Sequence, residues 1–369
     1  MKVLNLTWKI VRIPLLLFLL YIVGVLLHGS LTDFQPPEKL DLTLDGAVSS
    51  PTPLSTDSLL RILSLNIGYA GLGEESTFFY HGGGFFTAGG RMVRPPKELS
   101  DKNLGGIAQI LKDNPADVYL LQEVDKPCKR SHQTDQYQKL IETLPSTQSS
   151  FSVNYDVQRV PAPVLQPWKA YGRTHSGLAT FSRHSIKAAE RLQLPGRSSW
   201  PSYLFQLDRC VAVHRIPLDN GKELVIANIH NAAYDKTGTI KSLQLNFLKE
   251  LFIKDYEAGN YVIAGGDWNQ SPPYFDNSRL NPGKGPSHPA AYISPDLFPP
   301  SWQWIYDPLT ETVRHNTTPY EKGKNYVRVI DYFLLSPNIQ AVKVRCINHK
   351  FKYSDHQPVM VEVKLKGVQ

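Results

Sequence analysis

The apolar residues of this chain form one long run near its start and many short runs after it. The long run, residues 13–27, reads IPLLLFLLYIVGVLL, and no charged residue occurs between Arg12 and Asp33. As a helix, the 20 residues between these two charges would extend about 30 Å, which is the thickness of the hydrocarbon layer of a bilayer. The pattern therefore predicts a membrane-spanning helix within residues 1–30.

The flank of this run predicts its orientation. Lys2, Lys9 and Arg12 precede it, and the first twelve residues contain no acid. Because basic flanks stay in the cytosol, we expect the rest of the chain outside the cytoplasm. A cleaved signal peptide is the alternative, but the LHGS sequence at residues 27–30 fits the small-x-small cleavage pattern poorly. We therefore expect an uncleaved anchor, and we favour cleavage and export less.

A polar segment follows the long run. Residues 31–58 contain QPPEK and SSPTPLSTDS, and such proline-, serine- and threonine-rich sequence is typical of a linker. From Leu59 onward, short apolar runs alternate with turn residues up to the C-terminus, and no internal repeat is visible. We therefore expect residues 59–369 to form one folded domain.

Strand-like runs dominate residues 59–369. Apolar positions recur at helical spacing in residues 101–111 and 240–251, and Gly259 ends the second of these helices. Strands are predicted at residues 59–69, 118–123, 177–183, 223–230, 261–269, 326–336, 341–347 and 358–365. Strands with interspersed helices predict an α/β fold in which sheets pack together and helices lie outside.

Composition and charge narrow the class of protein. The chain has 369 residues, of which 41% are hydrophobic and 20% charged, so a buried core is expected. The net charge is +7, but without the three basic residues of the N-terminal flank it is +4, from 37 basic and 33 acidic residues. That excess is too small to indicate nucleic-acid binding by itself. The three cysteines, Cys128, Cys210 and Cys346, are too few for a disulfide framework, and an odd number leaves at least one thiol.

Polar residues with catalytic chemistry stand in or just after the strand-like runs. They are Asn66, Glu123, His230, Asp267, Asn269, Asp331, Asp355 and His356. Strand ends of α/β folds can converge on one edge, where loops form a site. Carboxylate and amide oxygens suit Mg²⁺ or Mn²⁺, and a histidine beside an acid can stabilise developing charge. The set therefore predicts metal-assisted hydrolysis of a phosphoric ester. The scattered cysteines argue against zinc, and the lack of a G-x-S-x-G motif argues against a serine hydrolase.

Seven motifs also give the chain a family resemblance. In order, they are LSLNIGY, LLQEVD, GRTHSGLATFSR, IANIHN, GGDWNQSP, VIDYFLLS and YSDHQPVMVEV, across residues 59–365. In these motifs the chain resembles the endonuclease/exonuclease/phosphatase superfamily, which includes deoxyribonucleases, abasic-site endonucleases, inositol-polyphosphate phosphatases and neutral sphingomyelinases. The resemblance implies a four-layered α/β sandwich, in which helices flank two packed mixed sheets. It also implies that residues 59–369 are a catalytic domain that uses Mg²⁺, with Mn²⁺ as an alternative.

The resemblance further implies roles for the polar residues. Glu123 matches the principal metal-binding glutamate, and Asn66 and Asp355 match residues beside the metal. His230 matches the histidine that binds or protonates the scissile phosphate.

Two further pairs match the water-activating part of such a site. Asp267 and Asn269 match the pair that orients the attacking water and holds the phosphate. Asp331 matches the acid that supports the last histidine, His356.

The substrate stays open at this point. Tyr171 and Arg173 are candidates for phosphate contact, in a loop where some nucleases of the family carry a glutamate that this chain lacks. Residues 78–91, with HGGGFFTAGG, are either a surface insertion or a flap over the site or against lipid. Residues 271–300 match no family motif. A lipid-like phosphoester and a nucleic acid are the competing substrates. A non-catalytic binding module on the same fold is a further alternative for the function. No protein partner is inferable.

Overall fold

The structure is a computed structural model that describes residues 2–48, 52–82, 84–233, 235, 237–281 and 291–366. Parts of the predicted insertions at 78–91 and 271–300, namely residue 83 and residues 282–290, lie outside the described residues. The α-helices are α1 (Lys2–Leu31), α2 (Lys97–Asp113), α3 (Gln136–Thr143) and α4 (Thr239–Glu257). Short 3₁₀ helices are η1 (Gly68–Ala70), η2 (Phe79–Gly82), η3 (Pro167–Lys169), η4 (Ser202–Phe205) and η5 (Asn277–Leu280).

The strands form two large sheets and one small ribbon. The seven-stranded sheet has the order β1 (Lys39–Asp41), β6 (Ala188–Gln193), β7 (Cys210–Pro217), β8 (Glu223–His230), β9 (Tyr261–Asp267), β13 (Asp331–Leu335) and β10 (Gln303–Ile305). The six-stranded sheet has the order β14 (Ile339–Cys346), β15 (Val359–Leu365), β2 (Leu59–Asn66), β3 (Val118–Asp125), β5 (Gly172–Ser182) and β4 (Gln148–Val160). The ribbon consists of β11 (Val313–Arg314) and β12 (Val327–Arg328).

The two large sheets pack face to face around a shared apolar core. Ile62 and Leu120 of the six-stranded sheet are buried in one cluster with Ile226, Ile263 and Phe333 of the seven-stranded sheet. Central strands such as β8 and β9 are buried along almost their whole length, because their opposite faces are also covered. This explains why their sequences read as continuous apolar runs.

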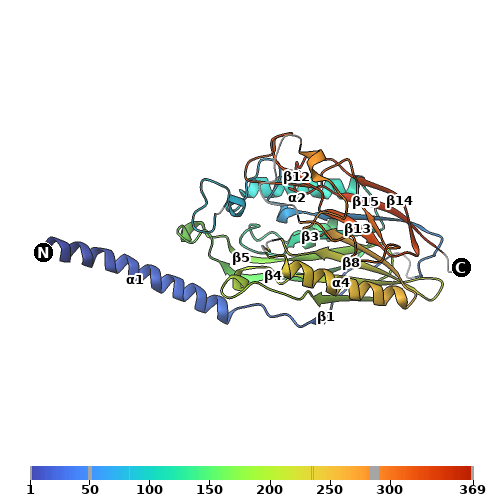
Figure 1. Ribbon diagram of the computed structural model, residues 1–369, viewed down its shortest axis with the longest axis horizontal. Coiled ribbons are helices and arrows are strands. Elements are labelled where there is room, and N and C mark those ends of the chain that lie inside the picture. Colours follow the sequence, from blue (N-terminus) through green and yellow to red (C-terminus); the bar gives the residue numbers. More distant parts are fainter. Residues whose placement is uncertain are drawn as a thin grey trace.

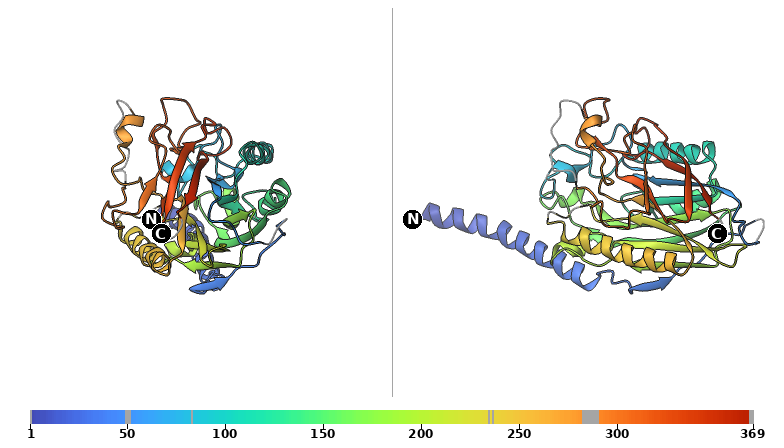
Figure 2. Two further views of the ribbon diagram at one scale, coloured as in Figure 1. Left: turned by 90° about the vertical axis from the view of Figure 1, so that its right-hand side faces the viewer. Right: turned by 45° about the vertical axis from the view of Figure 1, so that its right-hand side comes forward.

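Helices cover the outer faces of both sheets (Figures 1 and 2). On the seven-stranded sheet, α4 buries Leu248 and Phe252, which lie one turn apart on the same side of the helix. On the six-stranded sheet, α2 buries Ile107 and Leu111 in a cluster that also includes residues of α3. The order of layers is helix, sheet, sheet and helix, so the four-layered α/β sandwich is confirmed.

The sequence prediction missed several strands, including β6 and β7, and some of its strand boundaries differ from the structure. The strand predicted at 326–336 is divided into β12 and β13, since the Ile330 N–H donates to the Thr312 side chain instead of to a neighbouring strand. Edge strand β4 was not predicted, because its sequence, QSSFSVNYDVQRV, is rich in small and polar residues. Its partner β5 begins five residues earlier than expected, at Gly172.

The polar segment at 31–58 lies against the domain in its described parts. β1 pairs antiparallel with β6 and forms the edge of the seven-stranded sheet, and the Asp45 and Ser149 backbones exchange hydrogen bonds. Leu54 is buried in the core between the sheets. The sequence predicted only a linker here, because three residues of strand with exposed side chains leave no recognisable pattern.

The N-terminal helix α1 extends away from the domain (Figure 1). Its stretch Arg12–Leu31 is long and apolar enough to cross a membrane, and only 6% of it is buried. A signal sequence has the same properties, so the structure supports either a membrane span or a signal sequence at this end of the chain.

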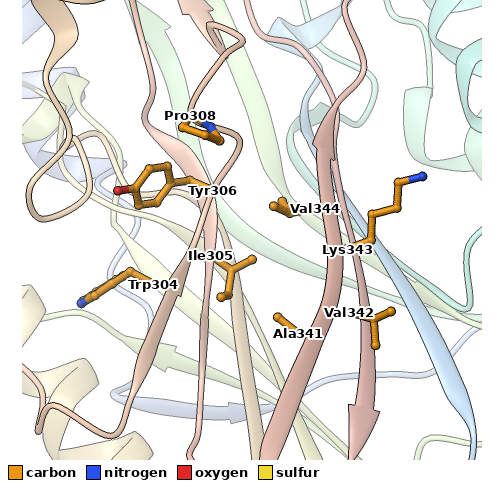
Figure 3. Close-up of a pocket in the computed structure, with 8 residues that line it drawn as sticks. All are labelled: Trp304, Ile305, Tyr306, Pro308, Ala341, Val342, Lys343 and Val344. Carbon is orange, nitrogen blue, oxygen red and sulfur yellow. The ribbon is translucent and has the colours of Figure 1, made fainter.

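A shallow groove runs where the edges of the two large sheets meet, between β10 and β14. It has a volume of about 390 Å³. Figure 3 shows Ile305, Ala341 and Val344 turned toward one another across it, whereas Lys343 points away. These three apolar side chains pack against the core between the sheets, so the groove is the lateral border of that core.

Candidate active site

Parallel strand pairs bring four of the predicted residues to one end of the sandwich. β2 and β3 are parallel neighbours in one sheet, and they end near Asn66 and Glu123. β8 and β9 are parallel neighbours in the other sheet, and they end at His230 and Asp267, which are opposite each other in the register. Because the two sheets face each other, the carboxyl ends of these four strands lie together, and the four residues meet there.

The remaining predicted residues reach the same end from antiparallel strands. Asp331 is the first residue of β13 and is paired with Asp267, the last residue of β9. Asp355 and His356 come just before β15, which runs antiparallel to β2. Chain direction therefore explains why some of the residues follow a strand and others precede one.

Asn66 and the two histidines connect the carboxylates of the cluster. The Asn66 amide Nδ2 lies 3.2 Å from Glu123 Oε1 and 3.2 Å from Asp267 Oδ2, and donates to both. His230 Nε2 lies 3.5 Å from Asp267 Oδ2 and 3.8 Å from Glu123 Oε1. His356 Nε2 lies 3.8 Å from the same Asp267 oxygen. The sequence prediction that these side chains converge therefore agrees with the geometry.

Two of these residues have a left-handed backbone conformation. Glu123 has a φ of 53°, and the register between β3 and β5 shifts between Leu121 and Val124, as in a β-bulge. Asn269 also has a φ of 53°, and its backbone N–H donates to Asp267 Oδ1 at 2.8 Å. Such conformations cost energy in residues other than glycine and are concentrated at functional sites.

His356 and Asp331 form a buried ion pair. His356 Nδ1 lies 2.9 Å from Asp331 Oδ2 and 3.1 Å from Oδ1. Burial alone would lower the pKa of His356, but the charge and hydrogen bond of Asp331 raise it to about 10. The imidazole is therefore a cation at neutral pH, and Asp331 fixes which face it presents to Asp267.

The other histidine has the opposite charge state. His230 is buried, and burial together with the nearby charges of Arg209 and His356 holds its pKa well below the usual range. It is therefore a neutral imidazole at neutral pH. Its Nδ1 is a buried atom without a hydrogen-bond partner in the described part of the chain.

Asp267 and Asp355 are buried carboxylates with raised pKa values. Burial raises the pKa of Asp267 to about 6, against the lowering effect of His356. Burial likewise raises the pKa of Asp355 to about 6; His356 opposes this effect and the charge of Glu123 adds to it. Carboxylates buried together in this way are stabilised by a nearby cation.

Asn316 is a site residue that the sequence prediction missed. It is fully buried, and its Nδ2 donates to Asp355 Oδ2 at 2.7 Å. Its Oδ1 contacts the Nδ1 of His81, which comes from the aromatic insertion at 78–91 and stacks on His315. Asn316 has no motif of its own and lies between strands, so only the fold reveals that it supports Asp355.

Two basic side chains near Asp267 were also missed. Lys241 on α4 is 9% exposed, and Arg328 on β12 is half-buried. Burial lowers the pKa of both, and Asp267 is among the charges that oppose this effect. Within the described residues neither side chain has an ion-pair partner, so both charges are available to an anionic ligand at this end of the sandwich.

The two loop candidates differ in where they lie. Tyr171 is buried, its hydroxyl accepts a hydrogen bond from Arg130 at 3.0 Å, and its ring packs near that of Tyr69. Arg173 instead pairs with Asp156 on the neighbouring strand β4 and donates to the Thr174 carbonyl oxygen. The structure therefore gives Arg173 a partner within the sheet, and its contact with a phosphate stays a prediction.

The residues predicted to hold a divalent metal have suitable donor atoms. Asp355 Oδ1 is buried without a hydrogen-bond partner in the described residues. Gly68 beside it has a φ of 51°, and a side chain there would come within 3.0 Å of that oxygen. Asp267, Asp331 and His356 also offer ligand atoms within 4.8 Å of one another. However, the charge of Asp331 is already used to neutralise His356. Glu123 and Asp355 are therefore better suited than this set to bind a divalent metal.

Solved structures with the same fold are numerous. An endonuclease/exonuclease/phosphatase from Beutenbergia cavernae superposes with a TM-score of 0.55 at 18% identity, covering 84% of this chain and 72% of that chain. ANGEL2, a 2′,3′-cyclic phosphatase in complex with adenosine-2′,3′-vanadate, gives 0.54 at 16% identity, covering 89% and 99%. A family protein from Bacteroides vulgatus gives 0.52 at 14% identity, covering 84% and 100%. At such low identities these similarities establish the fold alone.

Sequence comparison identifies the family. No curated protein sequence is a significant match to the chain. The model of the Endonuclease/Exonuclease/phosphatase family, however, matches residues 63–356, which include all eight polar residues of the cluster. This chain therefore belongs to the endonuclease/exonuclease/phosphatase family, whose members are hydrolases acting on phosphoric esters.

Proposed function

We propose that this protein hydrolyses a phosphoric ester by metal-assisted attack of water, with Mg²⁺ or Mn²⁺ as the metal. Membership of the family supports the reaction class, and its members generally use divalent metal ions. The observation that carries the proposal is the Asn66 amide, which bridges Glu123 and Asp267 at 3.2 Å each. This contact joins a metal-binding carboxylate to a water-orienting one in a single cluster.

The metal would be held by Glu123 and Asp355. Asn66 would orient Glu123 beside it, because its Nδ2 donates to that carboxylate while its Oδ1 accepts from the Gly68 N–H. The unpartnered Oδ1 of Asp355 and the neighbouring charge of Glu123 support this pair of ligands. A bound divalent ion supplies neutralisation of charge on the phosphoryl and leaving oxygens. The hydrogen bond from Asn316 holds Asp355 in a fixed orientation.

Asp267 and Asn269 would position the attacking water. Asp267 Oδ1 is fixed by the backbone N–H of Asn269, and Oδ2, which already accepts from Asn66, has a second lone pair that can accept a hydrogen bond from water. The Asn269 side chain is itself held, because its Nδ2 donates to the Asn231 carbonyl oxygen at 2.9 Å. A carboxylate held in this way can orient the water and accept its proton.

The histidines and the basic side chains would hold the phosphoryl group. The cationic His356, oriented by Asp331, stabilises negative charge on a non-bridging oxygen as that charge develops. Neutral His230 contributes a ring N–H beside the same Asp267 oxygen, Oδ2. The positive charges of Arg328 and Lys241 attract the anionic ester into the site.

We also propose that α1 is an uncleaved membrane anchor and that the domain lies outside the cytoplasm. The apolar stretch Arg12–Leu31 supports a span, and the basic residues before it support this orientation.

The first test is the hydrolysis of a panel of phosphoric esters with Mg²⁺ or Mn²⁺. The panel contains a nitrophenyl phosphodiester, sphingomyelin, phosphoinositides and DNA. We expect hydrolysis that stops when the metal is chelated, and a loss of about 10³-fold in the Asp267→Asn variant, because such groups act as a unit. Asp219→Asn is the matched control, because Asp219 is exposed in the turn between β7 and β8, at the opposite end of β8 from His230.

Two outcomes would contradict the proposal. Normal turnover by Asp267→Asn would exclude Asp267 from the chemistry. Failure of the protein to bind Mg²⁺ or Mn²⁺ by calorimetry would favour a non-catalytic binding module. Hydrolysis of DNA that weakens steeply with salt would assign the activity to a nuclease instead of an enzyme for small or lipid-borne esters.

A further inference from the structure

Large apolar side chains are exposed together at one end of the domain. Phe85 is 41% exposed and Phe86 60%, while Leu165 is 50% and Trp168 73% exposed. Their two loops are joined by backbone hydrogen bonds of 2.9 Å, from Val164 N to Phe85 O and from Leu165 N to Phe86 O. We call Phe85, Phe86, Leu165 and Trp168 the aromatic rim. Contiguous exposed apolar groups of this kind mark an interaction surface.

The aromatic rim lies beside the C-terminal half of α1. Arg159, near the end of β4, lines a hollow together with Tyr21, Val25 and His28 of that helix. The Arg159 guanidinium also donates to the carbonyl oxygen of Pro167, the residue before Trp168, at 3.5 Å. Figure 1 shows α1 leaving the domain at this same end. A bilayer crossed by α1 would therefore lie next to the rim.

The aromatic rim also borders the candidate active site. The loop that contributes Phe85 and Phe86 begins with Phe79, whose ring centroid lies 5.8 Å from that of Tyr171. His81 in the same loop contacts Asn316, which holds Asp355. A surface that seats on the rim would therefore be close to the proposed metal site.

We propose that the aromatic rim docks the domain onto the outer surface of the bilayer that α1 crosses, and that the substrate is a phosphoric ester carried by a lipid in that surface. The substrate part rests on the function proposed above. Three observations select a lipid surface as the occupant: the rim is apolar, it is rich in aromatic rings, and it adjoins an apolar helix that is itself almost wholly exposed. Aromatic side chains favour the level of the lipid headgroups.

Charge at the rim agrees with a lipid surface. Arg159 and Lys169 are both exposed; Lys169 follows Trp168 in the chain, and Arg159, near the end of β4, contacts the residue before Trp168. Basic residues at the membrane surface are attracted by lipid phosphates. A nucleic acid would instead require an extended basic groove, and the net charge outside the N-terminal flank is only +4, from 37 basic and 33 acidic residues.

The docking itself is tested without any activity. The three native cysteines are buried, so a single new cysteine on the surface can be labelled selectively with an environment-sensitive fluorophore. The full chain carrying Phe86→Cys is reconstituted in phosphatidylcholine vesicles, with Leu309→Cys as the control. Leu309 is 77% exposed and follows Pro308, which lines the groove between β10 and β14. In Figure 1, β14 lies on the opposite side of the domain from α1. We expect spin-labelled lipid to quench the fluorophore at least about twofold at residue 86 and not at residue 309, because only the rim enters the headgroup layer.

Two results would overturn the docking. Equal and weak quenching at residues 86 and 309 would place the rim in water. If the fluorophore at residue 86 is shielded from water only at high protein density and is not quenched by spin-labelled lipid, the rim would instead contact a second copy of the chain.

The substrate class is tested with a triple variant, Phe85→Ser, Phe86→Ser and Trp168→Ser. Hydrolysis of a lipid-borne phosphoester in the same vesicles should fall at least about tenfold, because each buried aromatic side chain contributes to seating the domain. Hydrolysis of a water-soluble nitrophenyl phosphodiester should stay unchanged. An equal loss of hydrolysis rate on both substrates would mean that the rim only maintains the structure of the active site. That result would overturn the proposal. If the wild type hydrolyses neither substrate, the proposed function fails while the quenching result still decides the docking.

Discussion

The substitution Asn316→Ala tests whether a hydrogen bond from Asn316 orients Asp355, the carboxylate proposed to bind the metal. Asn316 is fully buried, and its amide donates to Asp355 Oδ2 at 2.7 Å. Alanine removes this donor from the Asp355 carboxylate. The side chain that would bind the metal then loses its fixed orientation.

The size of the effect follows from the type of contact. A buried hydrogen bond to a charged group is worth about 1.5–3 kcal/mol, so its loss corresponds to about 10- to 150-fold in an equilibrium constant. Loss of a residue that orients a metal ligand typically weakens metal binding by about 10- to 100-fold. We therefore expect the dissociation constant for Mg²⁺ or Mn²⁺ to rise about thirtyfold.

Calorimetric titration of the full chain with Mn²⁺ measures this effect. Asn114→Ala is the matched control, because Asn114 is also a buried amide that donates to a carbonyl oxygen, that of Ile110, and accepts from Arg345. Both variants should lower the melting temperature by a few degrees, since each loses buried hydrogen bonds. Only Asn316→Ala should weaken metal binding. Unchanged affinity in Asn316→Ala, or an equal loss in Asn114→Ala, would refute the reasoning.

Three further predictions concern charge. Asp331→Asn should lower kcat by about 10²- to 10³-fold, because the buried histidine that it orients loses its counter-charge; an unchanged kcat would exclude the pair from the chemistry. Arg328→Met should raise KM for an anionic ester about tenfold, and Arg279→Met, at an exposed position of η5, should not; equal values for both variants would contradict the assignment. Burial and the nearby charge of Asp33 raise the pKa of Asp208 to about 7, from 3.8 in the unfolded chain. This group therefore stabilises the fold below pH 4, and the contribution is lost as the pH rises through 7. In Asp208→Asn the free energy of unfolding should depend less on pH between 4 and 7 than in the wild type. At pH 8 it should be about 2 kcal/mol higher than in the wild type, after discounting for partial exposure. Urea titrations at pH 4 and 8 measure both values, and identical pH dependence in the two proteins would contradict the reasoning.

The fold was predictable from sequence for most strands that are buried on both faces, although β7, which contains His214 and Arg215, was missed. β8 begins and ends where the apolar run ELVIANIH does, at Glu223 and His230, because both of its faces are covered. Edge strands lack this signal, since solvent on one side permits polar residues. β4 therefore reads as a loop, and β1 reads as part of a linker.

The candidate site was predictable where its residues end strands. His230 and Asp267 terminate continuous apolar runs, so their position follows from chain direction alone. Asn316 and Arg328 have no such context, because their roles depend on loops and a two-stranded ribbon that meet the site from elsewhere in the chain. Arg173 lies within a motif, but its ion pair with Asp156 on the neighbouring strand depends on sheet pairing and could not be predicted from the sequence.

The short connection between α1 and β1 would decide which lipids such an enzyme can reach. Only the seven residues between Leu31 and Lys39 separate the helix from a strand that is hydrogen-bonded into the domain. Fully extended, they reach about 25 Å. A domain on so short a tether searches a patch of its own membrane and cannot act on a neighbouring vesicle. Its rate would then follow the mole fraction of substrate in the membrane plane, and diluting the vesicles in buffer would leave the rate per enzyme unchanged.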